Sequence, residues 1–189
     1  MKKLLFVAVL VIAFASAALS QPFGKGYHGI NAGIGLGNGY YTASAYSFGF
    51  GINGSYEYGI VEIPMGSSLT GVVGIGGTAG LSWSNYAYSY WDGKYHYTNW
   101  AMAARGTYHF IFDNDKVDPY AGLTLGYQGS AYKWKGNGQA PDYHGSSGYF
   151  RVGAFVGCRY LFMENFGVFG ELGWQLNFMN LGVCWIINK

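Results

Sequence analysis

Charged residues are scarce in this 189-residue chain, because Asp, Glu, Lys and Arg make up only 11% of it. That is about half the usual share for a soluble globular domain, so a wholly water-facing exterior is not expected. After the first twenty residues, no stretch approaches the roughly 18 to 20 continuous apolar residues of a membrane helix. Low charge favours a membrane protein, and the missing apolar run means that strands would have to cross the bilayer.

Cysteine and net charge are also low. Cys158 and Cys184 fall on opposite faces of two non-adjacent predicted strands, which disfavours a disulfide and a zinc site. The 11 Lys and Arg residues include Lys2 and Lys3, and the other nine balance nine Asp and Glu residues. A formally neutral chain has no electrostatic support for a nucleic-acid partner. Neither a metal nor a cofactor is predicted.

The first twenty residues have the pattern of a secretory signal. Lys2 and Lys3 form a basic start, and residues 4–14 form an apolar run that is too short to span a bilayer. Two cleavage points are open, after Ala17 or after Ser20, and neither is followed by a cysteine that could carry a lipid anchor. We predict a signal peptide over residues 1–20 and one domain over residues 21–189.

The remaining sequence alternates strictly with a period of two. In residues 29–37, one phase is apolar and the other is glycine or asparagine: Ile30, Ala32, Ile34 and Leu36 alternate with Asn31, Gly33 and Gly35. Residues 47–57 repeat the pattern. A period of two is that of a β-strand, in which successive side chains point to opposite faces. The few charges within strands all fall on the Gly/Ser/Asn phase, so we expect lipid outside and polar groups inside.

Eight strands can be drawn, over residues 29–37, 47–60, 69–83, 99–112, 119–132, 149–162, 167–175 and 179–188. The connections after the even strands are short and rich in turn residues, whereas those after the odd strands include the long segments 38–46, 84–98 and 133–148. Short periplasmic turns and long outer loops are typical of transmembrane barrels. The fold predicted is all-β: an eight-stranded antiparallel up-and-down transmembrane β-barrel. A count of ten strands is the alternative if residues 84–98 pair as a hairpin.

Aromatic residues on the apolar phase gather near the predicted strand ends. Those towards the loops are Phe48, Trp83, Trp100, Phe150 and Trp174, and those towards the turns are Tyr56, Tyr58, Tyr108, Phe110, Phe112, Tyr160 and Phe162. Aliphatic and small residues lie between them. Ten residues from Phe48 to Tyr58 span roughly 23 Å of membrane at about 3.3 Å per residue and a tilt near 45°. This spacing predicts an apolar band between two aromatic girdles.

The closing segments resemble a known family. Arg159-Tyr160, residues 165–174 (NFGVFGELGW) and residues 180–183 (NLGV) are similar to the final hairpins of small OmpA/OmpX-like outer-membrane β-barrel proteins. The resemblance implies a monomer in the outer membrane of a diderm bacterium, surrounded by lipid and lipopolysaccharide and inserted by the outer-membrane assembly machinery. One departure is that such proteins commonly end on an aromatic residue, for which Trp185 would stand in here.

Five charged residues are predicted to point into the barrel lumen: Glu57, Arg105, Arg151, Arg159 and Glu171. Arg159 and Glu171 are equidistant from the turn at Asn165, so antiparallel pairing predicts an ion pair between them. One interpretation is a paired charge cluster that fills the lumen. The other is a gate in a narrow pore, for which the many inward glycines would leave volume, unless tyrosine or phenylalanine rings lie over them.

The sequence contains two further kinds of candidate site. His109 lies well inside a predicted strand and faces the lumen, but no Ser or Asp is evidently placed to complete a catalytic triad, so no enzyme is predicted. The loops are rich in aromatic residues that suit carbohydrate or protein recognition: Tyr86, Tyr88, Tyr90, Trp91, Tyr95, Tyr97, Trp134 and Tyr143. The sequence therefore favours a non-enzymatic envelope protein with a structural or surface-exposed role. A narrow channel for small solutes or ions, and adhesion or ligand recognition through the loops, are the alternatives.

Overall fold

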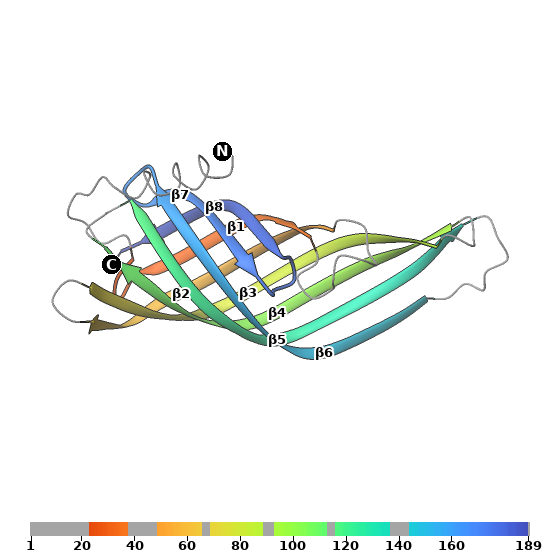
Figure 1. Cartoon of the computed structure of the whole chain (residues 1–189), viewed down its shortest axis with the longest axis horizontal. Coiled ribbons are helices and arrows are strands. Elements are labelled where there is room, and N and C mark those ends of the chain that lie inside the picture. The colour runs from red at the N-terminus through yellow and green to blue at the C-terminus, as the bar shows by residue number, and fades with distance from the viewer. Residues whose placement is uncertain are drawn as a thin grey trace, which may run out of the picture.

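The structure is a computed structural model that describes residues 23–37, 49–65, 69–88, 93–112, 116–136 and 144–188. Its eight strands are β1 (His28–Leu36), β2 (Phe50–Met65), β3 (Leu69–Tyr88), β4 (Gly93–Ile111), β5 (Val117–Gly136), β6 (His144–Leu161), β7 (Phe166–Gly173) and β8 (Met179–Ile187). Each strand pairs antiparallel with the next, and β8 pairs with β1 to close the ring (Figure 1). The predicted eight-stranded up-and-down barrel is confirmed.

Two segments predicted as long loops are largely strand. Within residues 84–98, β3 continues to Tyr88 and β4 already begins at Gly93; within residues 133–148, β5 continues to Gly136 and β6 begins at His144. The hairpin anticipated in residues 84–98 is real, because Ser84 pairs with Tyr97 and Tyr86 with Tyr95. It extends β3 and β4 and adds no strands, so the count stays at eight and not ten.

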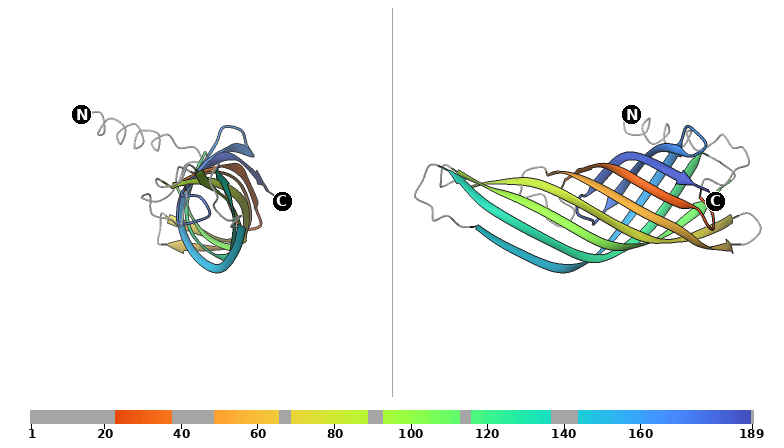
Figure 2. Two further views of the ribbon diagram at one scale, coloured as in Figure 1. Left: turned by 90° about the vertical axis from the view of Figure 1, so that its right-hand side faces the viewer. Right: turned by 180° about the vertical axis from the view of Figure 1, so that it is seen from behind.

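The strands differ greatly in length. β1, β7 and β8 have 9, 8 and 9 residues, whereas β3 to β6 have 18 to 20. The tall strands therefore continue past the closed ring as a four-stranded sheet, which extends to the right in Figure 1 and to the left in the right-hand view of Figure 2. We call this part, residues 84–88, 93–99, 130–136 and 144–149, the projecting sheet. Its inner face continues the barrel interior.

The barrel exterior is apolar. Side chains that are 40% to 79% exposed include Trp83, Trp100, Phe150 and Trp174 towards the projecting sheet and Tyr56, Phe110, Tyr160 and Phe162 towards the turns. Between them lie exposed aliphatic residues such as Met102, Leu123 and Val152. The predicted sorting of aromatic residues by depth is confirmed for the described positions, and Phe48 lies outside them. Within the described residues, no helix has the length and apolarity to cross a membrane.

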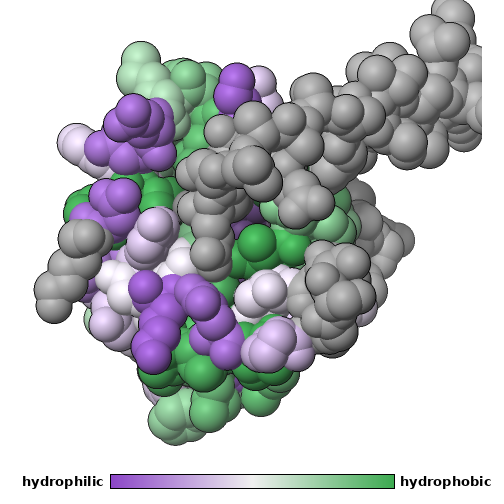
Figure 3. Space-filling view, turned by 90° about the vertical axis from the view of Figure 1, so that its left-hand side faces the viewer, coloured by the Kyte–Doolittle hydropathy of each residue, from purple (hydrophilic) through white to green (hydrophobic). Residues whose placement is uncertain are grey.

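The interior is polar, as the alternation predicted. Asn31, Glu57, Arg105, Arg159 and Glu171 are each at most 3% exposed. Seen from the turn end, hydrophilic side chains gather on the end face, and hydrophobic ones border it above and below (Figure 3). The barrel therefore buries charge and exposes hydrocarbon, the reverse of a water-soluble domain.

The first described residues close the turn end of the barrel. The Gly26 amide donates to the Gly59 carbonyl (2.9 Å), and the Gly59 amide donates to the Tyr27 carbonyl (3.0 Å). A register shift between Gly59 and Val61 marks a bulge in β2 at this point. This short pairing places Phe23, which is fully buried, inside the barrel. No strand-like signal precedes residue 29, so the plug formed by Phe23 was not predicted.

Candidate functional site

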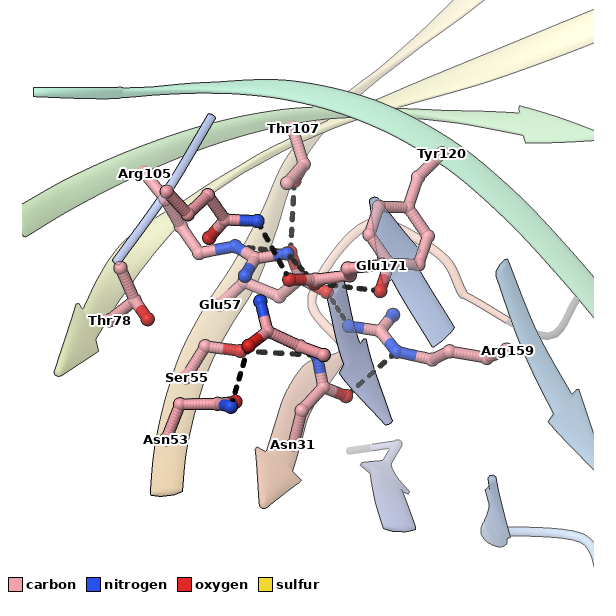
Figure 4. Close-up of polar contacts among 12 residues, drawn as sticks. Asn31, Asn53, Ser55, Glu57, Thr78, Arg105, Thr107, Tyr120, Arg159 and Glu171 are labelled. Atoms are coloured by element: carbon pink, nitrogen blue, oxygen red, sulfur yellow. Dashed lines mark hydrogen bonds and ion pairs between the residues drawn. The ribbon is translucent and has the colours of Figure 1, made fainter. Parts of the chain in front are cut away.

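Four of the five predicted lumen charges meet in one buried cluster. Glu57 comes from β2, Arg105 from β4, Arg159 from β6 and Glu171 from β7, and Figure 4 shows the two carboxylates lying between the two guanidinium groups. Closure of the ring arranges the four strands around one lumen, and the period of two turns all four side chains inward. We call these residues, with Asp118, His109 and their hydrogen-bond partners, the lumen cluster.

Arg159 is the centre of one half of the cluster. It donates to Glu57 through Nη2, to Asp118 through Nη1 at 2.8 Å and to the Asn31 side-chain oxygen through Nε at 3.0 Å. Its guanidinium carbon lies 4.9 Å from the centre of the Tyr120 ring. Because two carboxylates and an amide accept from one fully buried guanidinium, its charge is compensated inside the lumen.

Arg105 and Glu171 form the other half. Arg105 Nη2 donates to Glu171 Oε1 at 2.8 Å, and the Tyr120 hydroxyl donates to the same oxygen at 2.9 Å. Gln175 donates to Glu171 Oε2 at 3.1 Å. The Arg105 guanidinium also lies over the Phe155 ring, 4.4 Å from its centre. Tyr120 therefore links the two halves, because it contacts both the Glu171 carboxylate and the Arg159 guanidinium.

The predicted Arg159–Glu171 ion pair is wrong. Arg159 lies opposite Phe169, and Glu171 lies opposite Gly157. The turn occupies residues 162–165 and is not centred on Asn165, which shifts the register by two residues. A shift by two keeps both side chains in the lumen but changes their neighbours. Glu171 therefore pairs with Arg105 on β4, whereas Arg159 pairs with Asp118, directly opposite it on β5, and with Glu57 on β2.

His109 has the acidic partner that the sequence did not reveal. Its Nδ1 lies 2.7 Å from Asp118 Oδ1, and its Nε2 lies 3.2 Å from Thr107 Oγ1. Asp118 was missed because its strand was predicted to begin at Pro119, whereas β5 begins at Val117. The three residues stand in the order of a catalytic triad. The Thr107 hydroxyl, however, donates to Glu57 Oε2 at 3.0 Å, so its proton is not directed at His109.

Phe23 completes the lower side of the cluster. Its ring stacks on His109 with centres 4.1 Å apart, and the Arg159 guanidinium carbon lies 5.5 Å from its centre. Phe23 therefore covers the charged groups from the turn end.

Arg151 does not join the cluster. It lies on β6 opposite Gly126, at the level where the projecting sheet begins, and it is only half-buried. Its guanidinium carbon lies 4.4 Å from the centre of the Tyr149 ring.

The inward glycines do not leave an open channel. A Cβ at Gly157 would lie 2.6 Å from the Tyr120 ring, and one at Gly122 would overlap the Phe155 ring. The glycines thus make room for two aromatic rings from neighbouring strands. The sequence left open whether the inward glycines leave free volume or are covered by aromatic rings. At Gly157 and Gly122 they are covered by rings.

The lumen is also closed above the cluster. In the β7–β8 connection, residues 174–178, Gln175 and Asn177 are 7% and 1% exposed and point inward. A cavity of about 30 Å³ remains beside them, lined in part by Leu176 and Asn180, with room for one or two water molecules. Phe23, the cluster and this connection therefore block the lumen at three levels.

The predicted loop aromatics lie mainly on the projecting sheet. Tyr95, Tyr97, Tyr132 and Trp134 form a contact cluster on its inner face, in which the Tyr95 ring lies 4.8 Å from Trp134 and 6.0 Å from Tyr132. Tyr86 and Tyr88 belong to β3 by their backbone. Tyr90, Trp91 and Tyr143 lie outside the described residues.

Where the projecting sheet begins, the outer face changes from apolar to polar and the inner face changes from polar to aromatic. On the outward phase, Trp83, Trp100 and Phe150 are followed towards the tip by Asn85, Thr98 and Ser146, all exposed. On the inward phase, glycine and charge give way to the aromatic cluster of the inner face. The apolar exterior therefore ends where the projecting sheet begins on β3, β4 and β6.

The cysteines lie on opposite faces, as predicted. Cys184 points inward and is 1% exposed, whereas Cys158 is half-buried on the outward phase, and both thiols are free. Among the side chains that the structure describes, no group of three or more His, Cys, Asp or Glu is arranged to hold a metal ion.

No protein-family model matches the chain, and no curated protein matches it significantly. Among solved structures it is similar to Ail, the attachment invasion locus protein of Yersinia pestis, crystallised with the heparin analogue sucrose octasulfate. That likeness has 14% identity and a TM-score of 0.48, covering 86% of this chain and 95% of that one. It is also similar to the N-terminal β-barrel domain of Pseudomonas aeruginosa OprF, with 19% identity and a TM-score of 0.48, covering 87% and 100%. The strand pairing itself establishes that this chain is an eight-stranded antiparallel up-and-down β-barrel.

Proposed function

We propose that this protein is a non-enzymatic barrel of the outer membrane of a diderm bacterium, and that it holds the projecting sheet at the cell surface. The observation that supports this most is that the outer face changes from apolar to polar at the level where the projecting sheet begins. An apolar exterior bordered by aromatic girdles suits hydrocarbon, and the polar outer face beyond it suits water. Closed barrels and helices are the structures that satisfy all backbone groups in lipid.

The proposal includes the partners implied by this location: lipid and lipopolysaccharide around a monomeric barrel, and the assembly machinery that inserts it. Residues 1–20 lie outside the described residues. The signal peptide, and its cleavage after Ala17 or Ser20, therefore stay predictions.

Surface labelling in intact cells tests the orientation. In a Cys158→Ala/Cys184→Ala background, we expect Lys133→Cys on the projecting sheet to react with a membrane-impermeant maleimide. Glu164→Cys, in the β6–β7 turn, is expected to react only after the outer membrane is permeabilised. Both positions are exposed, so accessibility on the folded protein is matched. Labelling of Glu164→Cys alone in intact cells would contradict the orientation, and labelling of neither would contradict surface exposure.

The channel alternative makes a different prediction. Because Phe23, the lumen cluster and residues 174–178 fill the barrel, we expect the folded protein to give no discrete conductance steps in a planar bilayer. Truncating the plug with Phe23→Ala should not open it, since Arg159 and Glu57 still block the next level. Discrete steps from the unmodified barrel would favour a narrow channel over a closed scaffold.

A further inference from the structure

The inner face of the projecting sheet carries aromatic rings, and a row of polar side chains continues below them onto the lumen wall at the base of the sheet. Tyr95, Tyr97, Tyr132 and Trp134 lie towards the tip. Below them, Ser130 pairs with Asn99, which in turn pairs with Ser82, and Gln128 pairs with Tyr149. Aromatic side chains with a polar group, beside hydroxyls and amides, form the typical composition of an adaptable recognition surface.

The polar row has hydrogen-bonding capacity that the described residues do not use. Ser82 Oγ, Asn99 Oδ1 and Gln128 Oε1 are buried and have no partner among the described residues, and the same holds for Trp134 Nε1. These residues are 0%, 4%, 3% and 9% exposed. Buried polar atoms in proteins are nearly always hydrogen-bonded. The set therefore calls for a partner that donates to several oxygens and accepts from one indole.

We propose that the inner face of the projecting sheet binds a neutral carbohydrate chain. A pyranose ring offers apolar C–H faces for the aromatic rings and hydroxyl groups that both donate and accept hydrogen bonds, which matches the two layers of the inner face. The inference rests on the proposed function, because a surface location is what would give the sheet access to glycans.

Charge on the inner face favours a neutral ligand. Among the described side chains of this face and its border, Arg151 is the one cation, and its guanidinium already lies over the Tyr149 ring. Lys133, which lies between Tyr132 and Trp134 in the sequence, points to the outer face and is exposed. A sulfated polymer would need several cations on one face.

Calorimetric titration of the mature barrel in lipid nanodiscs tests the proposal, with maltohexaose and chitotetraose as neutral probes and a heparin fragment as the sulfated comparison. We expect at least one neutral probe to bind. Trp134→Ala and Tyr132→Ala should each weaken it roughly tenfold, as truncation of a central aromatic contact does. Lys133→Ala, between them on the opposite face, should leave the affinity unchanged.

Two further variants remove polar groups from the site and keep its aromatic rings. Asn99→Ala removes a polar partner below the rings, and Tyr132→Phe keeps the ring while removing its hydroxyl. Gel mobility before and after heating shows whether each variant is folded. Absence of binding to both neutral probes, binding of the heparin fragment alone, or equal losses in Lys133→Ala and Trp134→Ala would each overturn the proposal, as would an extended peptide that competes fully for the site.

The test separates this inference from the proposed function. Binding in nanodiscs with failed surface labelling would uphold the carbohydrate site and overturn the cellular orientation. Successful labelling without binding would uphold the cellular orientation and overturn the carbohydrate site.

Discussion

Replacing Arg159 by alanine is expected to lower the free energy of unfolding by about 3–5 kcal/mol. The guanidinium contacts both Glu57 and Asp118 inside a lumen where these carboxylates are 1% and 2% exposed. Without it, two carboxylates lose their closest cation and cannot recover water. The loss would be measured by urea titration of the barrel folded in phospholipid vesicles, followed by gel mobility.

Arg151→Ala is the matched control for this substitution. Both arginines lie on β6 and point inward, but Arg151 is only half-buried and lies away from the lumen cluster. We expect it to cost about 1 kcal/mol or less. Adding Glu57→Gln to Arg159→Ala should restore part of the stability, since a neutral amide tolerates the lost cation better than a carboxylate. Equal costs for the two arginine variants would contradict a structural role for the cluster.

Introducing arginine at Leu123 is expected to cost about 2–4 kcal/mol in a bilayer, the range for a basic side chain near the midplane of a lipid-facing barrel wall. Leu123 is 62% exposed and lies in β5, four residues from Tyr127, whose ring centre lies 5.4 Å from that of the girdle residue Phe150. In a water-soluble barrel, a charge at so exposed a position would change stability by no more than about 0.5 kcal/mol. The substitution therefore separates a lipid-facing wall from a solvated one.

Ser146→Arg supplies the comparison, because Ser146 is also outward-facing and exposed but lies on the projecting sheet. Its cost is expected to be near zero. Both variants would be refolded into the same vesicles and unfolded with urea. A cost at Leu123 no larger than that at Ser146 would mean that the apolar band does not face lipid.

The strand count, the inward and outward phases and the depth of the aromatic residues could be predicted because each depends on a period of two within one strand. The partners of the lumen charges could not. They depend on register between strands, and the position of the turn at residues 162–165 moved Arg159 away from Glu171. Asp118 was not predicted as a partner for a similar reason, because its strand begins two residues before Pro119.

The projecting sheet was mistaken for loops because the prediction equated strands with an apolar outward phase. That phase ends at Trp83 and Trp100, although the backbone pairing continues to Tyr88 and Gly93. Alternation persists there, with the aromatic residues on the inner face. The burial of Phe23 could not be predicted for a different reason. A single aromatic residue in a short segment before the first strand carries no periodic signal.

The lumen cluster also bears on how the chain reaches its final state. One hydrogen bond joins Arg159 to Asn31, 128 residues apart, and the whole network draws on β1, β2, β4, β5, β6 and β7. Such contacts form late, after the loop-closure entropy of nearly the whole chain has been overcome. Before β1 meets β8, the lumen charges would face an incomplete wall, where hydrocarbon solvates them poorly. Pairing of the lumen charges and closure of the ring by β1 and β8 therefore occur together. We expect insertion and folding to proceed as a single slow concerted transition without a stable half-inserted intermediate.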